Sequence, residues 1–227
     1  MGERAEAFLS SFNRIEKWLN DQLKNPQNMG FNQMVRRLSN HEELAVKTYE
    51  NDLLQISQLR NAIVHEQIGE DFVIAEPNQW ILDRIKKIET ELLQPETVIP
   101  RFAKNVTGFE QDIPISELLK IVAAKRYSQF PLYKKGVFQG LITLKALGYW
   151  FAKESTEGKI NLENRTAKDL IITDGKQTNF DFVAEDTTIN EVEQKFHNNG
   201  LLDAVFITKD GNPNGNLLGI VRPRDIF

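Results

Sequence analysis

Apolar residues recur with helical spacing through the first 95 residues of the chain. Residues three or four apart share one face of a helix, and the first such stripe consists of Phe8, Phe12, Ile15, Leu19 and Leu23. Segment 25–30 interrupts it, and further stripes lie at 34–38, 44–63 and 81–92. Residues 72–74 are apolar and are expected to be extended. The pattern predicts an up-and-down bundle of about four helices.

The second half of the chain repeats its own pattern. Adding 74 to positions 112, 115 and 117 gives positions 186, 189 and 191, and each pair holds the same residue: Asp, Ile and Glu. After the loop 210–215 the offset becomes 79, so that Gly140-Leu-Ile aligns with Gly219-Ile-Val. A constant offset with one loop-sized jump indicates two copies of one supersecondary unit.

Each copy is expected to contain a strand, a helix, two strands and a closing helix. Short apolar runs rich in β-forming residues predict a strand at 130–133 and its equivalent at 204–208, aligned residue for residue at the offset of 74. A further strand is expected at 140–143 in the first copy and at 217–221 in the second.

Local signals place the helix starts of the repeated unit. Thr188 is followed three residues later by Glu191, which predicts a capping box. The closing helices are expected to begin near Leu144 and Pro223, and the second of them is short in this sequence.

Proline marks the boundary between the two halves, because it discourages helix at and just before its own position. Pro95 and Pro100 stand where the helical stripes end. We therefore expect an α+β chain, with a helical bundle at 1–95 followed by a (β-α-β-β-α)2 pair at 96–227. The two copies of the pair are expected at about 98–153 and 166–227.

Composition excludes several classes of protein. The chain has 227 residues and no cysteine, so disulfides, thiolate metal sites and cysteine nucleophiles are excluded. Three scattered histidines give no ligand spacing, and no metal site is expected. The sequence has no apolar stretch of membrane-spanning length and no signal-peptide pattern, which together with the absence of cysteine fits a cytoplasmic location.

The net charge is unevenly distributed. The formal charge of −4 falls entirely on the residues before Glu96, and the rest of the chain is balanced. Neither half has the excess of lysine and arginine with which non-specific nucleic-acid binders neutralise phosphates. Any nucleic-acid role must therefore rest on a local site.

The repeated unit resembles the CBS domain, a family that occurs in tandem pairs with pseudo-twofold symmetry. The resemblance covers about residues 98–227 and rests on the register of the two copies. It implies clefts between the copies that bind an adenine nucleotide such as AMP, ADP, ATP or a cyclic adenine dinucleotide. The family signature is Gly, two apolar residues, Ser or Thr, two further residues and Asp. Its hydroxyl meets phosphate and its Asp meets ribose hydroxyls.

Each copy keeps half of that signature. The first copy keeps the hydroxyl of Thr143 but has Ala146 at the Asp position. The second keeps Asp225 but has Arg222 at the hydroxyl position, with Arg224 nearby. Positive charge suits phosphate, so the resemblance implies one nucleoside site centred on Asp225. Its expected residues are Thr143, Val205, Arg222, Arg224 and Asp225. A CBS pair that has lost its ligand, with Asp225 capping the final helix, is the alternative.

Late in the third helix, Arg60-Asn61 is followed by His65, the arrangement found in HEPN domains. These are small, often dimeric helical bundles, and many are metal-independent endoribonucleases. The resemblance would cover about residues 3–94. Positions 61 and 65 share a helix face, so that Asn61 could orient His65. An imidazole can move the proton of a ribose 2′-OH, and Arg60 would stabilise charge on the phosphate.

The two resemblances together predict a regulatory protein, expected to be a homodimer. Ligand binding to the CBS pair would open or close a cleft formed by two copies of the Arg60/His65 motif, and RNA would be the substrate. This requires the ligand to bind one arrangement better than the other. The alternative is a non-enzymatic adaptor whose helical domain binds a partner protein, with Arg60 and Glu66 as solvated surface charges.

Overall fold

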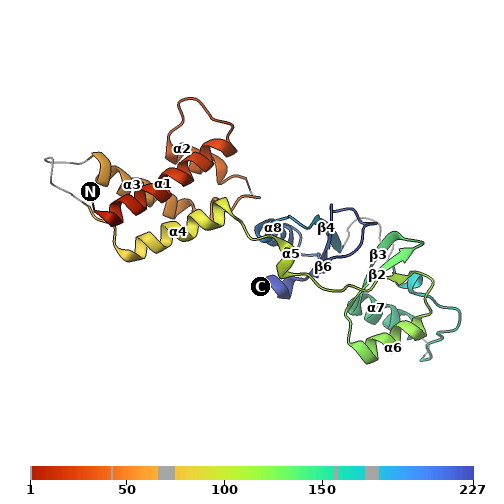
Figure 1. Cartoon of the computed structure of the whole chain (residues 1–227). Coiled ribbons are helices and arrows are strands. Elements are labelled where there is room, and N and C mark those ends of the chain that lie inside the picture. The colour runs from red at the N-terminus through yellow and green to blue at the C-terminus, as the bar shows by residue number, and fades with distance from the viewer. Residues whose placement is uncertain (1, 42, 66–74, 156–157, 172–178) are drawn as a thin grey trace. The chain divides into compact units, whose positions relative to one another are not determined.

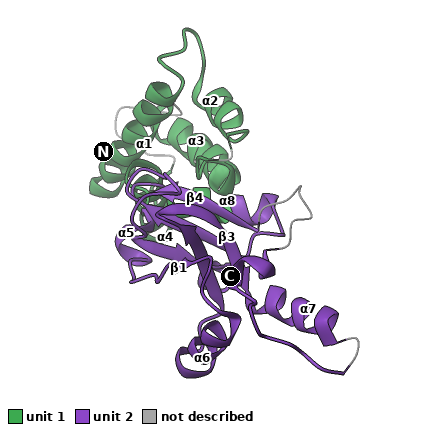
Figure 2. Ribbon diagram, turned by 90° about the vertical axis from the view of Figure 1, so that its right-hand side faces the viewer, with its two compact units in different colours: residues 1–96, 188–194 green, residues 97–187, 195–227 purple. Residues whose placement is uncertain are grey.

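The chain divides into two compact units, coloured separately in Figure 2. The first comprises residues 1–96 and 188–194, and the second comprises residues 97–187 and 195–227. The computed structural model describes residues 2–41, 43–65, 75–155, 158–171 and 179–227, without the side chain of His65. The segment 72–74, expected to be extended, lies outside the described residues.

The N-terminal part of the first unit is helical, as expected. The elements are α1 (Glu3–Gln22), α2 (Phe31–Leu38), the 3-10 turn η1 (Lys47–Tyr49), α3 (Glu50–His65) and α4 (Gln79–Leu93) (Figure 1). Helix α1 contacts the other three helices, and α2 also contacts α3. Asn78 caps α4 by accepting a hydrogen bond from the N–H of Ile81 at 3.0 Å, which satisfies one of the unpaired donors at the helix start.

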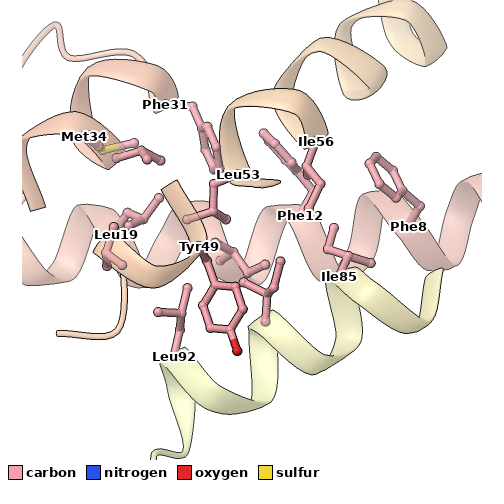
Figure 3. Close-up of a cluster of buried hydrophobic side chains, with 14 of the residues drawn as sticks. Phe8, Phe12, Leu19, Phe31, Met34, Tyr49, Leu53, Ile56, Ile85 and Leu92 are labelled. Carbon is pink, nitrogen blue, oxygen red and sulfur yellow. The ribbon is translucent and has the colours of Figure 1, made fainter. Parts of the chain in front are cut away.

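The predicted stripe of α1 is the centre of the core of this unit (Figure 3). Phe8, Phe12 and Leu19 are buried, and the Phe12 ring stacks on Phe31 with centroids 4.5 Å apart. Ile85 on α4 is also fully buried. Burial of each such side chain stabilises the unit by about 1.5–3 kcal/mol.

The third helix begins later than its apolar stripe predicted. The expected start was near Leu44, whereas α3 begins at Glu50 and residues 47–49 form a 3-10 turn. From Leu44 the next apolar position of the stripe, Tyr49, is five residues on, which does not match the three- or four-residue spacing of one helix face. The sequence prediction of this boundary was therefore wrong by about six residues.

A polar network lies beside the core of the first unit. The Tyr49 hydroxyl donates to Glu91 on α4, and the Arg84 guanidinium lies 5.3 Å from the Tyr49 ring centroid. The Nε of Arg84 donates to Asp52 at 3.2 Å. Burial, followed by the hydrogen bond to Glu91, raises the pKa of Tyr49 to about 12. The phenol is therefore held in its neutral form.

The second unit contains two three-stranded sheets that share one topology. In each, the first two strands pair parallel and the last two antiparallel. The first half contains α5 (Val98–Arg101), β1 (Phe109–Glu110), α6 (Ile115–Lys125), β2 (Gln129–Lys134), β3 (Val137–Thr143) and α7 (Leu144–Glu154). The second contains η3 (Ala167–Leu170), β4 (Phe180–Ala184), β5 (Ala204–Thr208), β6 (Gly219–Val221) and α9 (Pro223–Ile226). Between β4 and β5 the chain forms α8 (Ile189–Asn198), whose residues up to 194 are grouped with the first unit.

The local signals at the helix starts are confirmed. The backbone N–H of Thr188 donates to Glu191 at 2.7 Å, and the N–H of Glu191 donates to the Thr188 hydroxyl at 3.2 Å, which is the predicted capping box of α8. Helices α7 and α9 begin at Leu144 and Pro223, the residues expected from the sequence.

The alignment of the middle strands at an offset of 74 was wrong by one residue. Ile142 pairs with Phe130 in the first sheet, and Val221 pairs with Val205 in the second. The final strands are related by 79, because each runs directly into its closing helix. Phe130 therefore corresponds to Val205, at an offset of 75.

One added residue before β5 explains the error. Helices α6 and α8 start at Ile115 and Ile189, which are still 74 apart, so the extra residue lies between α8 and β5. A one-residue shift exchanges the two faces of a strand. Phe130 packs in the core with Ile115, whereas Ala204 packs in a separate cluster that includes Leu141 of the first half.

That separate cluster joins the two halves of the second unit and is centred on the ring of Phe138. Its centroid lies 4.9 Å from those of Phe180 and Phe182, 5.9 Å from that of Phe206 and 5.4 Å from that of Tyr133. The interplanar angles are 62–83°, the edge-to-face arrangement that aromatic pairs favour. A residue of β3 is thus inserted among three rings of the second sheet.

The long loop that changes the repeat offset adds a hydrogen bond to this contact. The Oδ1 of Asn214 accepts from the backbone N–H of Phe138 at 2.9 Å. The N–H of Asn214 donates to Asn212, whose own N–H donates to Asp210, so side chains of the loop order its backbone. The insertion therefore helps to hold the two halves together.

Candidate functional site

The two signature segments occupy equivalent positions before the closing helices. Thr143 is the N-cap of α7, and its hydroxyl accepts from the N–H of Ala146 at 3.2 Å. Arg222 is the N-cap of α9, and Asp225 is three residues on. The hydroxyl of Thr143 is buried and serves the helix, while the charged residues of the second copy are only partly buried.

Asp225 is engaged by Arg222 through three hydrogen bonds. The Nε and Nη2 atoms of Arg222 donate to the two carboxylate oxygens at 2.7 Å each, and the backbone N–H of Arg222 donates to Oδ2 at 2.9 Å. The two side chains are 22% and 20% exposed. Desolvation opposes ionisation of Asp225, but the side-chain and backbone hydrogen bonds from Arg222 outweigh it and lower the pKa of the carboxyl group. The side-chain hydrogen bonds to Asp225 in turn raise the pKa of Arg222.

Lys104 adds a further cation that the sequence did not indicate. Its backbone N–H donates to the carbonyl of Leu218 at 3.1 Å, and Ala103 forms a bridge with Gly219 at the start of β6. The approach is close, because a Cβ on Gly219 would lie 2.3 Å from the backbone oxygen of Phe102. Segment 102–104 is thereby held beside the strand that leads to Arg222.

The neighbouring groups change the pKa of Lys104. Desolvation, followed by the positive charges of Arg222 and Arg224, lowers the pKa of the Lys104 ammonium, and Asp225 acts in the opposite direction. Arg224 itself is exposed. We call Lys104, Arg222, Arg224 and Asp225 the charged cluster; it combines three cations with one carboxylate.

Val205 is fully buried, unlike the residues of the charged cluster. It lies in β5, pairs with Val221 and has no exposed surface. The structure thus brings Arg222 and Asp225 into contact, with Arg224 on the same helix, and leaves Val205 in the core of its sheet. Thr143 lies in the other copy at the equivalent helix start.

The HEPN-like motif of α3 lines a separate pocket within the first unit. The pocket measures about 300 Å³ and is lined by Phe12, Glu16, Gly30, Phe31, Asn32, Gln33, Ser57, Arg60 and Asn61. Its lining includes the stacked Phe12 and Phe31 rings together with polar residues. The sequence indicated only Arg60 and Asn61. The other polar residues come from α1, α2 and, for Ser57, α3, and they carry no motif of their own.

Arg60 and Asn61 contact each other in this pocket. The Nη1 of Arg60 donates to the Oδ1 of Asn61 at 3.3 Å, and the guanidinium carbon lies 5.7 Å from the Phe12 ring centroid. Asn61 is exposed and Arg60 is half-buried. The side chain of His65 lies outside the described residues. Its backbone stands in α3 one turn after Asn61.

A larger pocket, of about 570 Å³, lies in the second unit and contains none of the predicted residues. It is lined by residues 162–166 with Pro114 and Ser116. Its arginine, Arg165, donates to Glu154 at 3.0 Å. The pocket therefore offers a ligand a cation that is already paired.

Within the part of the chain that the structure describes, no group of three or more histidine, aspartate or glutamate side chains is arranged to hold a metal ion. Across the same residues, none of the helices has both the length and the apolar character needed to cross a membrane.

Comparison with known proteins assigns the segment that carries Arg222, Arg224 and Asp225 of the charged cluster. Residues 168–227 match the model of the CBS domain family. This part of the chain is a CBS domain. It contains β4, α8, β5, β6 and α9, and therefore Arg222, Arg224 and Asp225. No curated protein matches the chain.

Solved CBS structures resemble a larger part of the chain at low sequence identity. The CBS domain of a bacterial CNNM/CorC family Mg²⁺ transporter in complex with ATP is 18% identical, covers 63% of this chain and 90% of its own, and has a TM-score of 0.44. The CBS domain pair of protein MJ0100, in complex with 5′-methylthioadenosine and S-adenosyl-L-methionine, is 20% identical, with 58% and 93% coverage and a TM-score of 0.43. A CBS protein of Agrobacterium tumefaciens, ATU1752, is 16% identical, with 57% and 87% coverage and a TM-score of 0.43.

Proposed function

We propose that this protein senses an adenine nucleotide through a tandem CBS pair at residues 96–227 and thereby regulates a HEPN-like domain at residues 1–95. The observation that carries the proposal is the charged cluster, because Arg222, Arg224 and Asp225 lie in the CBS domain at the position of the family signature and Lys104 adds a third cation. Three cations attract a phosphate group, and Asp225 is a carboxylate that can accept hydrogen bonds from ribose.

The ligand of this proposal is AMP, ADP, ATP or a cyclic adenine dinucleotide. Mass spectrometry of nucleotide released from the purified protein would identify it, and calorimetry would give its affinity. Asp225→Ala should weaken binding by about tenfold or more, because each charge-assisted hydrogen bond contributes roughly 1.5–3 kcal/mol. Thr143→Ala is the matched control at the equivalent position of the first copy, and it should have a smaller effect. Absence of binding heat with every adenine nucleotide would refute nucleotide sensing.

For the helical domain we propose metal-independent cleavage of RNA by Arg60, Asn61 and His65. Support comes from the pocket beside Arg60 and Asn61, which offers an arginine to a phosphate. The 2′-OH would attack the neighbouring phosphate, so products should end in a 2′,3′-cyclic phosphate. Cleavage should persist in EDTA and should stop in Arg60→Ala and in His65→Ala. Cleavage that persists in His65→Ala would have to come from a contaminating nuclease.

A non-enzymatic adaptor is the second candidate, and the packing of Arg60 favours it. Its guanidinium lies over the Phe12 ring and bonds to Asn61, as a structural arginine does. In this case the helical domain would bind a partner protein, and no RNA of a broad panel would be cleaved with or without nucleotide. Both candidates include a homodimer, which sedimentation would test.

A further inference from the structure

The arrangement of Arg222 around Asp225 limits what the carboxylate can bind, and the inference drawn from it rests on the proposed nucleotide site. A carboxylate has about four lone-pair positions on its two oxygens. Arg222 occupies three of them through Nε, Nη2 and its backbone N–H. About one position is left, whereas the two hydroxyls of a ribose need two.

A ribose can therefore be held at both hydroxyls only if the Arg222 side chain gives up at least one of its two bonds to Asp225. The Arg222 side chain is only 22% exposed. A partly buried guanidinium that loses its carboxylate needs another anion, because an unpaired charge in such a place is costly. A nucleoside has no anion to offer. A nucleotide brings one in the same molecule, next to the ribose.

The surrounding charges favour the same exchange. With Lys104 and Arg224 added to Arg222 and Asp225, the formal charge of the cluster is positive, so a phosphate would enter an attractive field. Arg222 can bind a phosphate in the same bidentate geometry in which it binds Asp225. Release of Asp225 and capture of phosphate would then occur together.

We propose that Arg222 is a specificity-determining residue that holds Asp225 until a phosphate replaces it, so that the site selects adenine nucleotides over adenosine and other nucleosides without phosphate. Specificity is the difference between two affinities, so the site can select the nucleotide by weakening the binding of the nucleoside. A threonine, the family residue at this position, could not hold the carboxylate in this way.

The test compares two ligands in two forms of the full-length protein. Calorimetry would measure AMP and adenosine with the wild type and with Arg222→Thr, which restores the hydroxyl of the family signature. In the wild type, AMP should bind at least about tenfold more tightly than adenosine, the effect of about one charge-assisted contact. In Arg222→Thr the affinity for adenosine should rise by about tenfold, and the preference for AMP should shrink accordingly.

Arg224→Thr is the matched control, since it removes the same charge from the same helix and leaves the Arg222–Asp225 pair in place. It should weaken AMP without strengthening adenosine. Folding of Arg222→Thr is supported by the hydrogen bond from the backbone N–H of residue 222 to Asp225, which does not involve the side chain. Circular dichroism and the fluorescence of Trp150 would verify it.

The outcomes separate the two proposals. If neither ligand, nor ADP, ATP or a cyclic dinucleotide, binds any of the proteins, the proposed function itself fails. If adenosine binds the wild type as tightly as AMP does, or if folded Arg222→Thr gains no affinity for adenosine, nucleotide sensing stands and the role of Arg222 is refuted.

Discussion

Replacement of Phe138 by alanine should weaken the contact between the two halves of the second unit. The ring lies within 6 Å, centroid to centroid, of four other rings: Tyr133, Phe180, Phe182 and Phe206. Loss of a fully buried phenylalanine costs about 3–5 kcal/mol. Because Phe138 is only half-buried, we expect a loss of about 2–3 kcal/mol in the free energy of unfolding of this unit.

Tryptophan fluorescence can report on this unit alone. The sequence has three tryptophans, Trp18, Trp80 and Trp150, of which only Trp150 lies in the second unit. Unfolding by urea would be followed in a background with the other two replaced by phenylalanine. The midpoint of the Trp150 transition should move to lower urea, with the slope unchanged if only stability is altered.

Two companion variants define the result for Phe138. Tyr149→Ala, at a side chain that is 61% exposed, is the control and should change stability by less than about 0.5 kcal/mol. Phe138→Leu introduces the residue found at the equivalent position 217, and it should cost about 1 kcal/mol through the lost edge-to-face contacts. If Phe138→Ala is no more destabilising than Tyr149→Ala, the aromatic cluster does not hold the halves together.

Three further predictions concern pH, backbone contact and capping. Because the pKa of Tyr49 is raised to about 12, the stabilisation it provides is fully present below the unfolded value of about 10 and should be lost as pH rises from about 10 to 12; Tyr49→Phe should flatten that part of a stability–pH curve. Gly219→Ala should destabilise the second unit and weaken nucleotide binding, because the new Cβ would meet the backbone oxygen of Phe102 at 2.3 Å; urea unfolding and calorimetry would measure the two effects. Thr143→Ala should cost about 1 kcal/mol of unfolding free energy through loss of the N-cap of α7, and an unchanged urea midpoint would refute that capping role.

Periodicity predicted the helices of the first unit well, because their burial is set by one repeating face. The stripe of Phe8, Phe12, Ile15 and Leu19 is buried throughout. It failed at Leu44, where apolar residues are buried from a turn rather than from a helix. Spacing reports burial, and burial alone does not fix the backbone conformation that achieves it.

The repeat predicted the order of elements in the second unit but not the register of its middle strand. The structural equivalent of Phe130 is Val205, but its neighbours Ala204 and Phe206 are apolar as well. Aligning the sequence with itself therefore cannot detect one added residue between α8 and β5. Only hydrogen bonding to the last strand resolves it. Val205, one of the expected residues of the ligand site, is fully buried in β5, and the sequence did not indicate that degree of burial.

The candidate site was predictable where its residues are close in sequence. Arg222, Arg224 and Asp225 follow from a short signature, although the sequence did not show that Arg222 would bond to Asp225. Lys104 was not predictable from the sequence. It is placed beside the cluster by the bridge between Ala103 and Gly219, two residues that are far apart in the sequence of the second unit. No single-sequence pattern reports a pairing of that range.

The bridge between Ala103 and Gly219 also bears on the order of folding. It closes a loop that contains most of both copies of the repeated unit, so the entropic cost of closing that loop must be met before the contact forms. During synthesis Lys104 leaves the ribosome near the start of the first copy, and Asp225 leaves near the end of the second. The charged cluster is therefore a late product of folding. Fragments that begin after residue 104 would retain both sheets and lack one of its cations.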